Sequence, residues 1–161
     1  MSLAVIYSRA IIGVQAPSVT VEVHISNGLP GLTLVGLPET TVKEARDRGR
    51  SALINNGFTF PARRITVNLA PADLPKEGGR YDLPIALAIL AASEQLPLAP
   101  LARYEFLGEL ALSGALRAVR GAIPAALAAA DARRQLILST DNAAEVGLIA
   151  QSQSHTAQHL L

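Results

Sequence analysis

Alternation of apolar and polar side chains along the first part of the chain predicts β-strands. β-branched runs separated by turn residues place three strands at residues 4–14, 19–26 and 32–37. In the second strand the residues of one face are all apolar: Val19, Val21, Val23 and Ile25. A fourth strand is predicted at 63–74, where "RRITVNLAPADL" leads into a loop rich in proline, glycine and charge.

The segment 38–58 carries the end signals of a helix. Thr40 or Thr41 can cap its start, with Glu44 as the capping-box partner of Thr41. "Asn-Gly" at 56–57 is typical of a helix end.

A second helix is predicted from Leu83 to Ser93, with Asp82 as N-cap and Pro84 in the first turn. Asp82 is therefore expected to have a structural role. The rest of the chain predicts, in order, a linker (95–104), two short strands around a Ser-Gly turn (105–119), an alanine-rich helix (121–134), a strand (135–139), a short helix (142–150) and a tail with little signal (151–161).

Hairpin-like strand pairs followed by strand-helix-strand crossovers indicate an α+β domain, or mixed-sheet α/β domain, with helices packed on one side of the sheet. The length suits one domain with a proper core. We expect this domain to occupy residues 1–150 and a tail or linker to occupy 151–161.

Composition narrows the function classes. No apolar run approaches a membrane span, and the first residues lack the pattern of an export signal, so we expect a cytoplasmic protein without membrane contact. The chain has no cysteine, which excludes disulfides and thiolate metal sites. A net charge of +1 means that nucleic-acid binding would have to rest on a local patch.

Known catalytic and ligand motifs are missing from the sequence. It contains no Gly-Lys pair, which a P-loop needs, and Asp82 puts a negative charge where a phosphate would sit at the helix start. His155 and His159 are spaced i, i+4 but lack the glutamate of a zinc motif, and His24 lies apart on a strand. No serine stands in a nucleophile elbow. We therefore expect no metal site and no cofactor in this chain.

One set of basic residues remains as a candidate surface for phosphates. Two of its members share a helix face and the others lie in loops or at strand ends: Arg46, Arg50, Arg63, Arg64, Lys76 and Arg80. The alternative is a solvated, salt-bridged surface, because acidic residues lie nearby in the sequence: Glu39, Glu44, Asp47 and Glu77.

Three long strings resemble one family: "VEVHISNGLPGLTLVGLPETTVKEARDRGRSALINNGF", "RRITVNLAPADLPKEGGRYDLPIALAILAAS" and "LGELALSGALRAVRGAIPAALAA". They are similar to the amino-terminal domain of the YifB/ComM family of magnesium-chelatase-like AAA+ ATPases, over about residues 3 to 150. The resemblance implies a ribosomal protein S5 domain 2-like fold, shared with the Lon protease domain.

The resemblance also implies partners and cofactors that lie elsewhere. It places a AAA+ module, with its ATP and magnesium, beyond Leu161. It implies a full-length homo-hexamer that resembles a branch-migration helicase acting in natural transformation.

The Lon likeness gives a role to the loop before the second helix. Pro75, Lys76 and Gly78 match the Lon pattern, but Arg80 stands where the nucleophilic serine would be. Ile123 stands where the lysine base would be. A serine-lysine dyad needs a hydroxyl and an amine that can lose its proton, so the resemblance implies no catalytic residue here. The loop, with Gly78 and Gly79, then serves as a scaffold that presents Arg80.

Three functions stay open. The first is a non-catalytic accessory domain that contributes to ring assembly or DNA engagement. The second is a docking module for proteins that does not touch DNA. The third is a remnant hydrolase, for which Tyr81 carries the nearest hydroxyl. One departure from the family pattern is Gly49, where a valine-like residue is expected; glycine there loosens the helix that carries Arg46 and Arg50.

Overall fold

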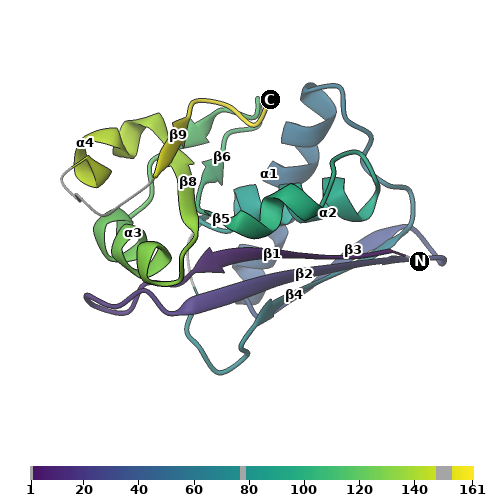
Figure 1. The fold of residues 1–161 in the computed structure, drawn as a ribbon. Helices are drawn as coiled ribbons and strands as arrows, with labels where there is room; N and C mark the ends of the chain where they lie inside the picture. Colours follow the sequence, from purple (N-terminus) through teal and green to yellow (C-terminus); the bar gives the residue numbers. More distant parts are fainter. Residues whose placement is uncertain (1, 77–78, 148–153) are drawn as a thin grey trace.

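Strands distant in the sequence meet in one seven-stranded sheet, ordered β3-β4-β2-β1-β5-β8-β9 (Figure 1). We describe a computed structural model that covers residues 2–76, 79–147 and 154–161. β1–β2 and β2–β4 pair antiparallel, whereas the other four pairs are parallel. The sheet strands are β1 (Ser2–Arg9), β2 (Ser18–Ser26), β3 (Gly31–Val35), β4 (Arg64–Ala70), β5 (Tyr104–Phe106), β8 (Gln135–Ser139) and β9 (His155–Ala157). This architecture confirms the mixed-sheet α+β class.

Two helices cover one face of the sheet because the apolar residues of β1, β2 and β4 point to that side. These are α1 (Glu39–Asn55) and α2 (Asp82–Ala92). All four apolar residues predicted to share a face of β2 are buried there, at 2% exposure or less. α2 is buried on nearly every side, so it lacks the amphipathic pattern of a surface helix.

A third helix, α3 (Ala122–Asp131), lies against the opposite face. Neighbouring residues of β8 show this: Leu136 and Leu138 pack in a cluster with α3, while Ile137 packs against the core below α1 and α2. Successive side chains of a strand point to opposite faces. The expectation of helices on one side is therefore wrong for α3, which closes its own small core of alanines.

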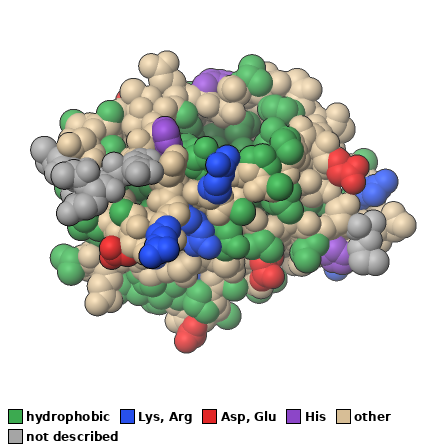
Figure 2. All heavy atoms as spheres, in the orientation of Figure 1, with side chains coloured by type: hydrophobic (Ala, Val, Ile, Leu, Met, Phe, Trp, Pro, Cys, Tyr) green, Lys and Arg blue, Asp and Glu red, His purple; other side chains and the backbone are tan. Residues whose placement is uncertain are grey.

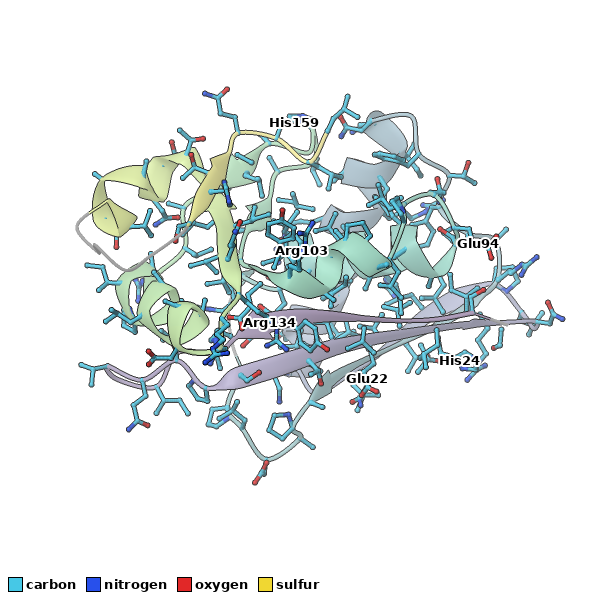
Figure 3. All side chains as sticks on the ribbon, viewed as in Figure 1. Glu22, His24, Glu94, Arg103, Arg134 and His159 are labelled. Atoms are coloured by element: carbon cyan, nitrogen blue, oxygen red, sulfur yellow. The ribbon has the colours of Figure 1, made fainter. Side chains whose placement is uncertain are left out.

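Part of that second face remains open. Thr20, Glu22 and His24 on β2 are half-buried rather than covered, and Asn68 on β4 donates to Glu22 at 3.0 Å. In Figure 3, Glu22 and His24 lie on the side of the sheet away from α2.

The short elements of the second half follow the predicted order. β6 (Glu109–Leu110) and β7 (Leu116–Arg117) form the expected hairpin around the Ser-Gly turn. The predicted linker contains the 3-10 helix η1 (Ala99–Arg103), and η2 (Thr140–Asn142) leads into α4 (Ala143–Val146). None of the helices in the described ranges has both the length and the apolar character needed to span a bilayer.

Both predicted side-chain caps are wrong. Pro38 precedes α1 and the structure gives this helix no side-chain cap, so neither Thr40 nor Thr41 has that role. Tyr81 precedes α2, and Asp82 is its first residue with its carboxylate directed to other partners. Part of the tail that carries little signal in the sequence forms a strand, because β9 pairs parallel with β8.

Candidate functional site

A pocket of about 230 Å³ opens beside the start of α2, at the loop that the Lon likeness singled out. Its walls come from three segments distant in the sequence: the loop before α2, β6, and the connection between β7 and α3. The lining residues are Gly79, Arg80, Glu109, Ala118, Val119 and Arg120. The pocket therefore brings Arg80 together with a second arginine that sequence reasoning did not single out.

The start of α2 is held in place by the carboxylate of Asp82. Arg48 of α1 donates to it through Nε at 2.7 Å and Nη2 at 3.2 Å, and the backbone N–H of Leu110 donates at 3.1 Å. The Asp82 side chain is 1% exposed. One carboxylate thus ties α1, α2 and β6 together at the pocket.

Burial decides the protonation behaviour of this carboxylate. Removal from water raises the pKa of Asp82 to about 6, although the hydrogen bonds from Arg48 and Leu110 act in the opposite direction. The hydrogen bond to Asp82 in turn raises the pKa of Arg48. At neutral pH the pair is ionised and serves as a structural tie.

Backbone contacts complete the frame around Arg80. The N–H of Gly108 donates to the carbonyl of Arg80 at 2.9 Å, and the N–H of Leu83 donates to the carbonyl of Gly108 at 3.0 Å. A Cβ on Gly79 would come within 2.7 Å of Cγ of Glu109, so a side chain there would displace Glu109 from the pocket wall. Gly78, the other predicted structural glycine, lies outside the described residues.

The side chain of Lys76 donates hydrogen bonds to the backbone of its own loop. Its side chain is buried, and Nζ donates to the carbonyl oxygens of Pro71 and Leu74, the latter at 2.9 Å. Burial lowers the pKa of Lys76. Its ammonium is therefore engaged with the chain's own backbone in this structure.

The pocket lacks the groups of a serine-lysine protease. Ile123, at the position of the Lon base, is half-buried in the first turn of α3. No described residue of the pocket wall carries a hydroxyl. Tyr81, the nucleophile of the remnant-hydrolase hypothesis, is 1% exposed.

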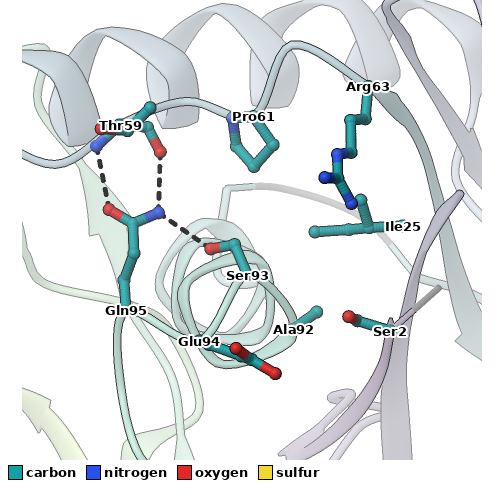
Figure 4. Close-up of a pocket in the computed structure, with 9 residues that line it drawn as sticks. All are labelled: Ser2, Ile25, Thr59, Pro61, Arg63, Ala92, Ser93, Glu94 and Gln95. Atoms are coloured by element: carbon teal, nitrogen blue, oxygen red, sulfur yellow. Dashed lines mark hydrogen bonds between the residues drawn. The ribbon is translucent and has the colours of Figure 1, made fainter. Parts of the chain in front are cut away.

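The other predicted basic residues lie away from this pocket. Arg63 lines a separate pocket of about 430 Å³ at the far end of α2, together with Thr59 and Glu94 (Figure 4). An 11-residue helix is roughly 16 Å long, so Arg63 and Arg80 stand at opposite ends of α2. The six basic residues do not form one groove around α2.

Contacts on α1 and β4 account for the remaining members of the set. The guanidinium carbon of Arg50 lies 5.9 Å from the centre of the Phe60 ring. Nε of Arg46 lies 3.7 Å from Oδ1 of Asp47. Arg64 is exposed at the start of β4. Arg46 and Arg50 share the exposed side of α1, as their spacing predicted.

Sequence reasoning missed Arg48 although a signal was present. Arg48 lies among small, buried positions of α1, between Ala45 and Ala52. A charged side chain on the buried stripe of a helix requires a buried partner of opposite charge. That partner, Asp82, had been assigned to a cap. Within the described residues, no cluster of three histidine or acidic side chains could hold a metal ion.

The fold and the sequence together define the class of the protein. The family model described as "Subunit ChlI of Mg-chelatase" matches residues 21–142, and the chain belongs to this family of magnesium-chelatase-like proteins. This confirms the family resemblance drawn from the three strings.

Individual relatives agree with this assignment. The chain is 68% identical over 160 residues to a protein named YifB from Salmonella typhimurium, covering 99% of this chain and 32% of the relative. It is 64% identical over 161 residues to the competence protein ComM from Haemophilus influenzae, covering 100% of this chain and 32% of the relative. A protein from Mycobacterium tuberculosis, Rv2897c, is 42% identical over 150 residues, covering 92% of this chain and 30% of the relative. The chain thus spans about a third of the length of these relatives.

Proposed function

We propose that the chain is a non-catalytic accessory domain of a ComM/YifB-like AAA+ ATPase, and that it contributes to ring assembly or DNA engagement. The observation that supports this most is the pocket at the start of α2. Where Lon-type proteases carry a serine, this pocket holds Arg80 on a loop fastened by Lys76 and by the Arg48–Asp82 pair. The scaffold of a catalytic loop is present, and its nucleophile is replaced by a cation.

An arginine at this place suits recognition rather than chemistry. Its guanidinium is protonated at any working pH and presents a planar fork of donors to a carboxylate or phosphate. Arg120 on the pocket wall adds a second cation, while Glu109 limits the local positive charge. We favour a carboxylate on a neighbouring subunit of the ring as the group that Arg80 contacts.

The parts that do chemical work lie in other segments of the full-length protein under this proposal. ATP and magnesium bind in a AAA+ module, and the assembled homo-hexamer drives branch migration of DNA. The name of the Haemophilus relative, a competence protein, supports a role in natural transformation.

Assembly of the full-length protein tests the proposal. We would measure hexamer formation with ATP by sedimentation velocity for the wild type, Arg80→Ala and Arg80→Lys, with Lys43→Ala on the exposed side of α1 as the control. We expect both Arg80 variants to assemble poorly, because lysine cannot reproduce the bidentate fork. Normal assembly of both variants would refute the interface role.

Two further measurements separate the alternatives. Hydrolysis of a fluorescent casein substrate should stay at background for the wild type, and turnover lost in Tyr81→Phe would instead support the remnant hydrolase. Failure of the full-length ring to bind DNA at low salt would favour the docking module.

A further inference from the structure

Three arginines outside the predicted set lie just before β5 and β8, at the edge of the sheet where these two strands begin. β5 and β8 run parallel with Tyr104 opposite Gln135, and Arg103, the last residue of η1, and Arg134 directly precede these two neighbouring strands. Adjacent strands are about 4.8 Å apart. Arg133 precedes Arg134, and Arg103 and Arg133 are exposed. Figure 3 labels Arg103 and Arg134 on the same side of the molecule, where Figure 2 shows basic side chains gathered.

The side chains at this edge carry an excess of positive charge. Glu105 is completely buried, and it accepts two hydrogen bonds from Arg9, at 2.7 and 2.9 Å, as well as one from Arg134 at 3.3 Å. Asp131, which is exposed two residues before Arg133, is the second carboxylate here, so four arginines face two carboxylates and an excess positive charge remains. Arg103 and Arg133 form no ion pair with any described residue. The whole chain carries only +1, so a local excess of this kind is what a phosphate-binding surface on this chain would need.

Arg134 is held in place by an aromatic ring and a carboxylate. Its guanidinium carbon lies 3.7 Å from the centre of the Tyr7 ring, while Nη1 bonds Glu105. Tyr7 pairs with Thr20 of β2 on the open part of the sheet. The edge therefore continues into a surface that offers a hydroxyl group beside the arginines.

The backbone at Arg133 gives a second, independent observation. α3 ends in a Schellman motif: the N–H of Arg133 donates to Ala130 at 3.0 Å and that of Arg134 to Ala129 at 2.9 Å. Arg133 takes the left-handed position with φ +60°, which glycine occupies in the same motif at the end of α1, at Gly57. A non-glycine residue there costs about 1 kcal/mol. An arginine in this place sacrifices local stability and adds a side chain to the patch.

We propose that Arg103, Arg133 and Arg134, the edge patch, bind successive phosphates of a nucleic-acid strand. Phosphates recur at short, regular intervals, so several guanidinium groups on one surface can neutralise several at once. The inference rests on the DNA-engagement branch of the proposed function and assigns it to a surface separate from the Arg80 pocket.

Fluorescence anisotropy with a labelled oligothymidine across a salt series tests the edge patch. With three phosphates neutralised, the plot of log K against log salt should have a slope of about −2. Arg103→Gln and Arg133→Gly should each weaken binding several-fold at low salt and reduce the slope by about 0.7. Lys43→Gln, which removes one charge from the exposed side of α1, should bind like the wild type.

Arg133→Gly also controls for loss of binding through misfolding. Because glycine relieves the left-handed strain, this variant should melt at the same temperature as the wild type or higher, and weaker binding then cannot come from misfolding. Wild-type binding in both patch variants, combined with weaker binding in Arg80→Ala, would overturn the edge patch and leave the proposed function standing.

The remaining outcomes are equally decisive. No binding by the wild type at low salt would overturn both the edge patch and the DNA branch of the proposed function, while the assembly role would survive. Displacement of the oligothymidine by polyglutamate at equal charge concentration would assign the edge patch to an acidic protein and overturn a nucleic-acid partner.

Discussion

The buried carboxylate at the start of α2 should make stability fall as pH rises. Burial raises the pKa of Asp82 to about 6 from its ordinary value of 3.8, because removal from water outweighs the hydrogen bonds from Arg48 and Leu110. A shift of two pKa units corresponds to about 3 kcal/mol between the two protonation states.

The sign follows from the direction of this shift. A group whose folded pKa is raised contributes stability that is full below the unfolded pKa and is lost as pH rises through the folded pKa. The window therefore runs from about pH 4 to pH 6. Between pH 4.5 and 7.5 the Asp82 carboxyl group should remove about 2 kcal/mol from the free energy of unfolding.

Urea unfolding of the wild type and Asp82→Asn at these two pH values measures the effect. Asparagine keeps an oxygen for the N–H of Leu110 and does not titrate, so the contributions of all other groups cancel in the comparison. We expect the wild type to lose about 2 kcal/mol more than the variant on going to pH 7.5. If the wild type instead gains stability relative to the variant as pH rises, the ion pair with Arg48 outweighs burial and the reasoning is refuted.

Three further changes test the rest of the fold by chemical denaturation. Gly49→Ala should stabilise the protein by up to about 1 kcal/mol, since a Cβ there would have no atom within 4 Å; a loss of stability would reveal a hidden packing constraint. Glu94→Gly should stabilise by about 1 kcal/mol because Glu94 has φ +63° at the end of α2, and a lower melting temperature would contradict this. Glu105→Gln should destabilise by about 3–5 kcal/mol, because Arg9 would lose its buried counter-charge; a change below about 1 kcal/mol would show that the pair is dispensable.

The sequence alone predicted those elements whose alternation of apolar and polar residues, or whose end signal, reflects the observed structure. β2 alternates because its apolar residues all enter the core, and α1 ends where Gly57 supplies the left-handed residue. β9 could not be predicted, because three residues without alternation gain their strand geometry only by docking on β8. The face of the sheet that α3 covers could not be predicted either, because the order of elements along the chain does not determine which face a helix packs against.

The candidate site was predictable in place but not in its contacts. The structure places Gly79 and Arg80 of the loop before α2 in the wall of a pocket, while the role of this loop as a scaffold for Arg80 stays a prediction. The role of Asp82 was misassigned because its partner, Arg48, lies 34 residues earlier in the chain, whereas capping signals are local. Arg103 and Arg134 could be seen as neighbours only once β5 and β8 were known to be adjacent and parallel.

The way in which the Arg80 loop is held separates its function from the stability of the fold. The loop is fastened by the side chains of Lys76 and Asp82 and by the bond from the N–H of Gly108 to the carbonyl of Arg80. None of these three attachments uses the side chain of Arg80. Under the proposed function, neighbouring side chains and the backbone hold the loop whichever side chain residue 80 carries, so the assembly role of Arg80 can be tested without loss of the fold.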